Sequence, residues 1–147
     1  MTKAIYFDMD GTIANLYGVD NWLAYLENKN PYPYTNAKPL INMNSLARVI
    51  NRLQREGWHI GIVSWLSKAR DNKYDNEVTQ AKREWLNRHL HSVHWNEVVI
   101  VPYGTPKQNT VVFNEGILFD DEENNRVNWT GQAYDVDNII EILKGLK

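Results

Sequence analysis

Residues 4–12 read AIYFDMDGT. The four apolar residues at 4–7 are rich in β-formers and predict a short buried strand. Asp8 and Asp10 follow directly, and Gly11 allows the chain to turn sharply there. A solvated Asp-Gly turn produces the same local pattern. This stretch therefore indicates a functional site only if the other strands also end in polar residues that could join it.

Strand and helix signals alternate along the rest of the chain. We expect further strands at residues 58–63, 98–101, 116–119 and 133–134, and helices at residues 45–56, 77–90 and 136–146. Residues 60–63 are apolar on both faces apart from one glycine, as a central parallel strand should be. The alternation predicts an α/β fold with a three-layer, Rossmann-like parallel sheet and helices on both faces, in one domain over residues 1–147.

Residues 13–44 interrupt this alternation, and long connections of this kind are often functional. The aromatic residues of this segment include Tyr17, Trp22, Tyr25, Tyr32 and Tyr34. Two interpretations stay open. The aromatic side chains pack the segment onto the sheet, or some of them line a pocket and stack on a planar group such as a nucleobase. We expect the segment to form a short lid, or cap, inserted after the first strand.

Composition excludes several classes of protein. The 147 residues carry 18 acidic and 16 basic side chains, a formal charge of −2 that argues against a basic nucleic-acid clamp. The absence of cysteine excludes thiolate zinc sites and cysteine nucleophiles.

The three histidines at residues 89, 91 and 94 are a further candidate for a metal site. His89, His91 and His94 fit a polar helix end better than a zinc site. No apolar run approaches the roughly 18 residues of a membrane span, and no signal peptide is recognisable, so we expect a soluble, cytoplasmic domain.

Polar residues follow the other expected strands as well. Ser64 ends the second strand, Asp120 and Asp121 end the fourth, and Lys107 lies between the third and the fourth. In an open parallel sheet, ligands bind beyond the carboxyl ends of the strands. We therefore expect these residues to converge on Asp8 and its neighbours. Taken singly, each has an ordinary explanation, such as a helix cap, a surface lysine or an acidic turn.

The combination resembles the haloacid dehalogenase-like hydrolase superfamily over about residues 3–125. The first motif of that family is an apolar strand followed by Asp-x-Asp-Gly-Thr, which residues 5–12 match. Its strand-terminal serine or threonine is matched by Ser64, and its strand-terminal acidic pair by residues 120–121. An aspartate at position 10 indicates a phosphatase or phosphotransferase within this family.

The family's lysine has three candidates. Lys107 is the best match because it lies between the third and fourth strands, where the family places its lysine. Lys68 and Lys73 are the rivals. Lys82, together with Arg83 and Arg88, is interpreted as part of a solvated helix face.

The resemblance implies a role for each matched residue. The expected catalytic residues are Asp8 as nucleophile, Asp10 as general acid and base, and Lys107. The expected phosphate contacts are Thr12, Ser64 and Lys107. The expected Mg²⁺ ligands are Asp8, the backbone carbonyl of Asp10 and Asp120, with Asp121 binding the ion directly or through a bound water.

The sequence therefore predicts a Mg²⁺-dependent phosphomonoesterase that works through an aspartyl-phosphate. Nucleotides or nucleic-acid phosphate ends are the leading substrates, because the aromatic lid offers stacking surfaces. A sugar or other small-metabolite phosphate is the alternative with the same chemistry. A protein of this fold that binds phosphate or a partner with little turnover is the alternative from a different class.

Overall fold

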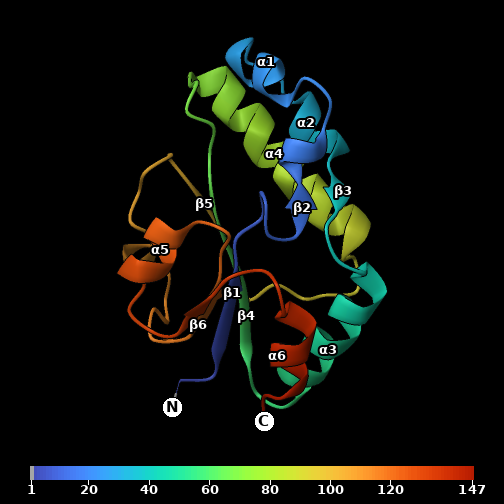
Figure 1. Cartoon of the computed structure of the whole chain (residues 1–147), viewed down its shortest axis with the longest axis vertical. Coiled ribbons are helices and arrows are strands. Elements are labelled where there is room, and N and C mark those ends of the chain that lie inside the picture. The colour runs from blue at the N-terminus through green and yellow to red at the C-terminus, as the bar shows by residue number, and fades with distance from the viewer. Residues whose placement is uncertain (1) are drawn as a thin grey trace.

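The computed structural model describes residues 2–147, and β1 is the central strand of its main sheet (Figure 1). The five strands of this sheet are β1 (Ala4–Phe7), β4 (His59–Trp65), β5 (Glu97–Val101), β6 (Ile117–Phe119) and β7 (Ala133–Tyr134). Their spatial order is β5-β4-β1-β6-β7, and all neighbouring strands are parallel. The predicted α/β, Rossmann-like sheet is confirmed.

The described helices are α1 (Trp22–Glu27), α2 (Tyr32–Asn36), α3 (Met43–Arg55), α4 (Asn72–His89), α5 (Glu123–Asn128) and α6 (Ile139–Lys144). Two short 3₁₀ helices, η1 (Leu16–Gly18) and η2 (Lys107–Asn109), and a small antiparallel sheet of β2 (Ala14–Asn15) and β3 (Lys38–Pro39) complete the elements. Among residues 2–147, no helix has the length and apolar character needed to span a membrane.

Alternation within β1 divides the core between the two faces of the sheet. Ile5 and Phe7 are fully buried in the larger cluster, which α3, α4 and α6 complete. Ala4 and Tyr6 point to the opposite face, where they pack with residues that include Trp129. Burial of β1 on both faces explains why its four residues are all apolar.

Three helices differ in their bounds from the sequence-based expectation, and side-chain caps explain the starts of α3 and α4. α4 begins at Asn72 rather than at residue 77, since the Asp71 side chain accepts a hydrogen bond from the Tyr74 N–H at 2.7 Å. α3 is capped by Asn42, which accepts from the N–H of Ser45 at 3.0 Å, so Ser45 is not the cap. The last helix is shorter than expected, at residues 139–144.

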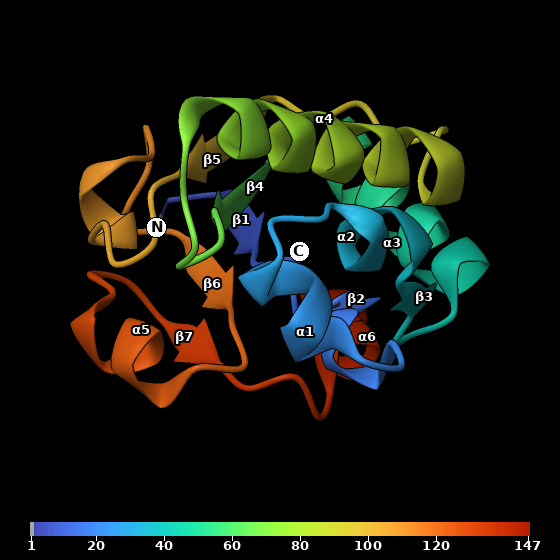
Figure 2. The ribbon, with the colours of Figure 1, turned by 90° about the horizontal axis from the view of Figure 1, so that it is seen from above.

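Residues 13–44 fold into β2, η1, α1, α2 and β3 and lead into α3. α2 packs against α4, and α1 against α2. Figure 2, which views the molecule from above, shows α1 and α2 in front of the sheet, with α4 running along one side. That this segment acts as a lid stays a prediction.

Candidate active site

Asp8 is the first residue after β1 and lies at the carboxyl edge of the sheet. Its N–H donates to the carbonyl of Phe119 at 2.9 Å, which extends the pairing of β1 and β6 by one residue. The chain then turns tightly, because the N–H groups of residues 12–14 all donate to the carbonyl of Met9. Gly11 has a φ of +80°, and a Cβ there would come within 2.3 Å of Asp121 Oδ2. This turn therefore requires glycine for its conformation and for space.

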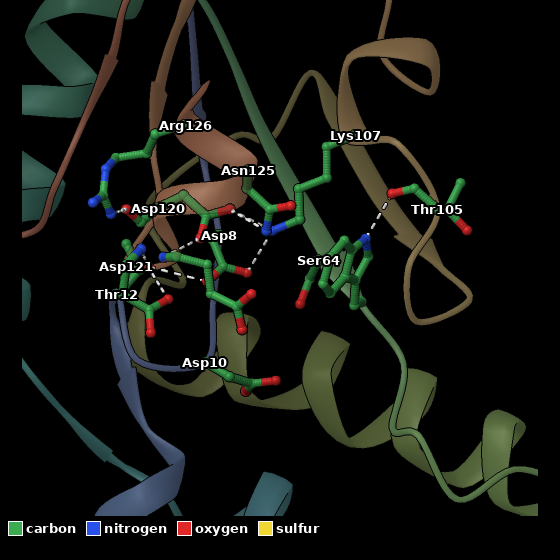
Figure 3. A network of polar contacts seen from close by, with 12 residues as sticks. Asp8, Asp10, Thr12, Ser64, Thr105, Lys107, Asp120, Asp121, Asn125 and Arg126 are labelled. Carbon is green, nitrogen blue, oxygen red and sulfur yellow. Dashed lines mark hydrogen bonds and ion pairs between the residues drawn. The ribbon is translucent and has the colours of Figure 1, made fainter. Parts of the chain in front are cut away.

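Lys107 is the charged centre of the site. It begins η2, is only 2% exposed, and places Nζ 2.9 Å from Asp8 Oδ1 and 2.7 Å from Asp120 Oδ2 (Figure 3). Burial opposes the charge on its ammonium, but the two carboxylates outweigh burial and raise the pKa of Lys107 above its ordinary value. Lys107 is thus the lysine between Asp8 and Asp120, while Lys68 lies at the rim of the adjoining pocket.

Three carboxylates gather beside this lysine. Asp8, Asp120 and Asp121 each offer an oxygen, and the three oxygens lie within 4.8 Å of one another. Burial and the charge of Asp8 raise the pKa of Asp120 to about 6. Burial and contact with Asp8 raise the pKa of Asp121 to about 8. Crowded carboxylate oxygens suit a hard divalent cation such as Mg²⁺, which would relieve their repulsion.

Hydrogen bonds from neighbouring elements hold these carboxylates in place. The hydroxyl of Thr12 lies 3.1 Å from Asp8 Oδ2 and accepts from the Asp121 N–H at 3.2 Å. Asn125 donates to Asp120 Oδ2 at 3.2 Å, and Arg126 donates to the Asp120 carbonyl at 2.9 Å (Figure 3). Thr12, predicted as a phosphate contact, is 1% exposed and tethers two carboxylates. Asn125 and Arg126 lie on α5, a helix that the sequence analysis did not anticipate.

Asp10 lies apart from the Asp8–Lys107 cluster in Figure 3. Its Oδ2 is 2.7 Å from the Nζ of Lys82, which also lies 2.7 Å from Ser64 Oγ. Ser64, predicted to end the second strand, lies one residue before the end of β4 and is fully buried. Burial raises the pKa of Asp10, the charge of Lys82 opposes that rise, and Asp8 adds to it.

The interpretation of Lys82 as part of a solvated helix face was wrong. Lys82 is 1% exposed, whereas its neighbour Arg83 and Arg88 are exposed. The sequence did carry a signal, because Lys82 lies four residues after Val78 and four before Leu86, on the apolar face of α4. A charged residue in such a stripe is buried only with partners, and here they are Asp10 and Ser64.

A cavity of about 390 Å³ opens above these residues. Asp8, Asp10, Lys107 and Asp120 line it on the polar side. Apolar and aromatic side chains form much of the remaining wall, namely Leu16, Tyr17, Trp22, Leu23, Leu26, Tyr34, Trp65, Leu66 and Tyr103. The carboxylate cluster is therefore reached through an aromatic-walled pocket.

Two parts of the chain contribute aromatic residues to this wall: residues 13–44, and the segments at the ends of β4 and β5. Tyr17 and Trp22, from residues 13–44, meet edge to face with ring centroids 4.9 Å apart. Trp65, the last residue of β4, and Tyr103, which follows β5, have ring centroids 4.8 Å apart. Tyr25 and Tyr32 instead stack on each other at 4.7 Å and line a separate hollow.

Comparisons with known proteins find solved structures whose fold is similar to that of this chain. No family model matches the chain, and no curated protein matches it by sequence. The solved D,D-heptose 1,7-bisphosphate phosphatase of B. bronchiseptica, complexed with magnesium and phosphate, is similar with a TM-score of 0.55 at 16% identity, over 90% of this chain and 78% of that one. The corresponding phosphatase of Burkholderia thailandensis gives a TM-score of 0.56 at 11% identity, over 97% of each chain. This chain therefore shares its fold with these two solved phosphatases.

Proposed function

We propose that this protein hydrolyses phosphate monoesters, with Asp8 as the nucleophile. The observation that carries the proposal is the buried Lys107 between Asp8 and Asp120, at the floor of a pocket and beside a third carboxylate. A lysine held there can offset the charge of a phosphate that approaches Asp8. Structural neighbours that are phosphatases support the same reaction class.

We propose Mg²⁺ as the cofactor. Its protein ligands would be the carboxylates of Asp8, Asp120 and Asp121 and the backbone carbonyl of Asp10, of which the three carboxylates already lie within reach of one ion. When bound, the ion would cancel the repulsion between the nucleophilic carboxylate and a doubly negative phosphate. A neighbour of this fold was solved with magnesium and phosphate, which supports this assignment.

The reaction would proceed in two steps on Asp8. In the first, an Asp8 oxygen forms a bond to phosphorus, the bond from phosphorus to the ester oxygen breaks, and Asp10 gives that oxygen a proton. In the second, Asp10 takes a proton from water as the water oxygen attacks phosphorus and releases Asp8 and inorganic phosphate. Lys107 and Ser64 would hold the phosphate oxygens in both steps.

Nucleotides are the substrates we propose, because the pocket offers planar apolar surfaces to the leaving group. Tyr17 and Trp22 on one side and Trp65 and Tyr103 on the other suit a nucleobase better than a polyhydroxylated sugar, which needs hydrogen-bonding partners. Nucleic-acid ends fit less well, since a polyanionic chain would meet Glu27 and Glu122, which also line the pocket. Sugar phosphates stay the second candidate, because the structural neighbours are heptose bisphosphate phosphatases.

A substrate panel with Mg²⁺ tests this proposal. We expect release of inorganic phosphate from p-nitrophenyl phosphate and nucleoside monophosphates, with kcat/KM highest for the nucleotides and lower for sugar phosphates and phosphorylated oligonucleotides. EDTA should abolish the release, and added Mg²⁺ should restore it. A preference for sugar phosphates would overturn the nucleotide assignment alone. Binding of phosphate without turnover of any ester would instead support a binding protein of this fold.

A further inference from the structure

Lys82 is a buried charge that the proposed reaction does not yet use. Its side chain is 1% exposed, and its Nζ lies 2.7 Å from Asp10 Oδ2, 2.7 Å from Ser64 Oγ and 5.0 Å from the centre of the Tyr34 ring. A buried ammonium is costly to desolvate and is retained only where partners compensate for that cost. An apolar side chain of similar volume would satisfy the apolar face of α4 equally well. Packing alone therefore does not account for this lysine.

The chemistry of an ammonium group fixes the direction of its hydrogen bonds. Lys82 can only donate, so Asp10 Oδ2 and Ser64 Oγ both act as acceptors toward it. The second oxygen of Asp10 is left for another partner, and Asp10 lines the pocket above Asp8. Ser64 keeps its own hydroxyl hydrogen available for a different acceptor. One side chain thus sets the orientation of two groups to which the proposed reaction assigns roles.

We propose that Lys82 is a positioning residue, which holds the Asp10 carboxylate where it can exchange a proton with the leaving oxygen. The inference rests on the proposed function. Lys82 reaches Asp10 from the middle of α4, a helix of 18 residues capped by Asp71. Rigid support of this kind matters because proton transfer needs donor and acceptor within hydrogen-bonding distance at the moment of reaction.

The test compares Lys82→Met, Asp10→Asn and the double variant on two esters with Mg²⁺. Glycerol phosphate has a leaving oxygen that needs a proton, whereas p-nitrophenyl phosphate releases a stable anion. Lys82→Met should lower kcat on glycerol phosphate about 10- to 100-fold and on p-nitrophenyl phosphate far less. The double variant should be no slower than Asp10→Asn alone, because Lys82 acts through Asp10. Lys73→Met, at an exposed position of α4, is the matched control and should match wild type.

Equal losses on both esters, or a double variant that is slower than Asp10→Asn by the full Lys82→Met factor, would overturn the inference. If Lys82→Met fails to fold because Asp10 is left without its partner, the double variant removes both charges and still tests the inference, and a stably folded double variant at least about 10-fold slower than Asp10→Asn on both esters overturns it. If the wild-type protein is active and Lys82→Met keeps the wild-type kcat on both esters, the inference fails while the proposed function stands. A wild-type protein inactive on both esters defeats the proposed function and the inference together.

Discussion

Both oxygens of the Asp8 carboxylate have partners before any substrate arrives. Lys107 donates to Oδ1 at 2.9 Å, and the Thr12 hydroxyl lies 3.1 Å from Oδ2. Such contacts restrict the carboxylate to a narrow range of orientations, which would favour in-line attack on phosphorus in the proposed reaction. Asp120 and Asp121 lie close to the same carboxylate, and its negative charge opposes ionisation of both.

That crowding predicts how stability depends on pH when no metal is bound. The pKa of Asp120 is raised to about 6 and that of Asp121 to about 8, from an ordinary value of 3.8. Between pH 4 and 8 these two carboxyl groups therefore hold more protons in the folded protein than in the unfolded chain, so their contribution to stability falls as pH rises. In EDTA we expect the Tm to decrease from pH 5 to pH 8, and Asp121→Asn to flatten that decrease.

Thermal melts across this pH range, with and without Mg²⁺, measure the effect. Mg²⁺ should raise the Tm more at pH 8 than at pH 5, because the ion competes with protons for the same oxygens. Glu123→Gln, at an exposed position of α5, is the control and should keep the wild-type slope. A Tm in EDTA that is flat or rises over this range would contradict the account.

At the scale of elements, residues 13–44 supply part of the pocket wall, which a leaving group would meet in the proposed reaction. The sequence left open whether the aromatic residues of this segment pack onto the sheet or line a pocket. In the structure, some of them line the pocket and others lie outside it. Tyr34 is 4% exposed and lines the pocket, Trp22 lines it while partly exposed, and Tyr25 stacks on Tyr32 outside it. Sequence alone could not make this division, because it depends on how α1 and α2 turn against α4.

Trp22→Ala should therefore weaken catalysis unequally among substrates. Loss of one stacking face should cost about 1–3 kcal/mol in kcat/KM for a nucleoside monophosphate, and less for glycerol phosphate, which reaches fewer wall residues. Tyr25→Ala is the matched control on the same helix, and we expect it to keep the wild-type ratio between the two substrates. Thermal melts should accompany the kinetics. The same loss on both substrates in a stably folded Trp22→Ala would argue against a role in specificity.

At the scale of the whole molecule, the strand order brings residues distant in sequence to one edge. β1 lies between β4 and β6, so Asp120 after β6 lies near Asp8, while Ser64 of β4 is linked to Asp10 through Lys82. Alternating apolar runs were sufficient to predict this sheet. Polar residues at the strand ends, together with the family resemblance, predicted that Lys107 and Asp120 lie beside Asp8. The start of α4 was predicted too late because an Asp cap with a polar first turn carries little hydrophobic periodicity.

Other features of the site needed the three-dimensional structure. The burial of Lys82 was overlooked because its basic neighbours suggested a solvated face, although the helical spacing placed it on the apolar one. Asn125 and Arg126 contact Asp120 only because α5 folds back after β6, and this short helix lies in a stretch that reads as an acidic turn. Tyr103 joins the wall through its contact with Trp65, between segments distant in sequence.

The central claim is that Asp8 carries the phosphoryl group during turnover, and trapping that group tests it most directly. Asp10→Asn should slow hydrolysis of the acyl phosphate, while p-nitrophenyl phosphate still phosphorylates Asp8 because its leaving group needs no proton. After an acid quench, borohydride reduces an aspartyl-phosphate to homoserine, which peptide mass spectrometry locates. We expect homoserine at position 8, and none in the matched Asp8→Asn control. Turnover with no reduction at position 8, or with reduction at another carboxylate, would contradict the account.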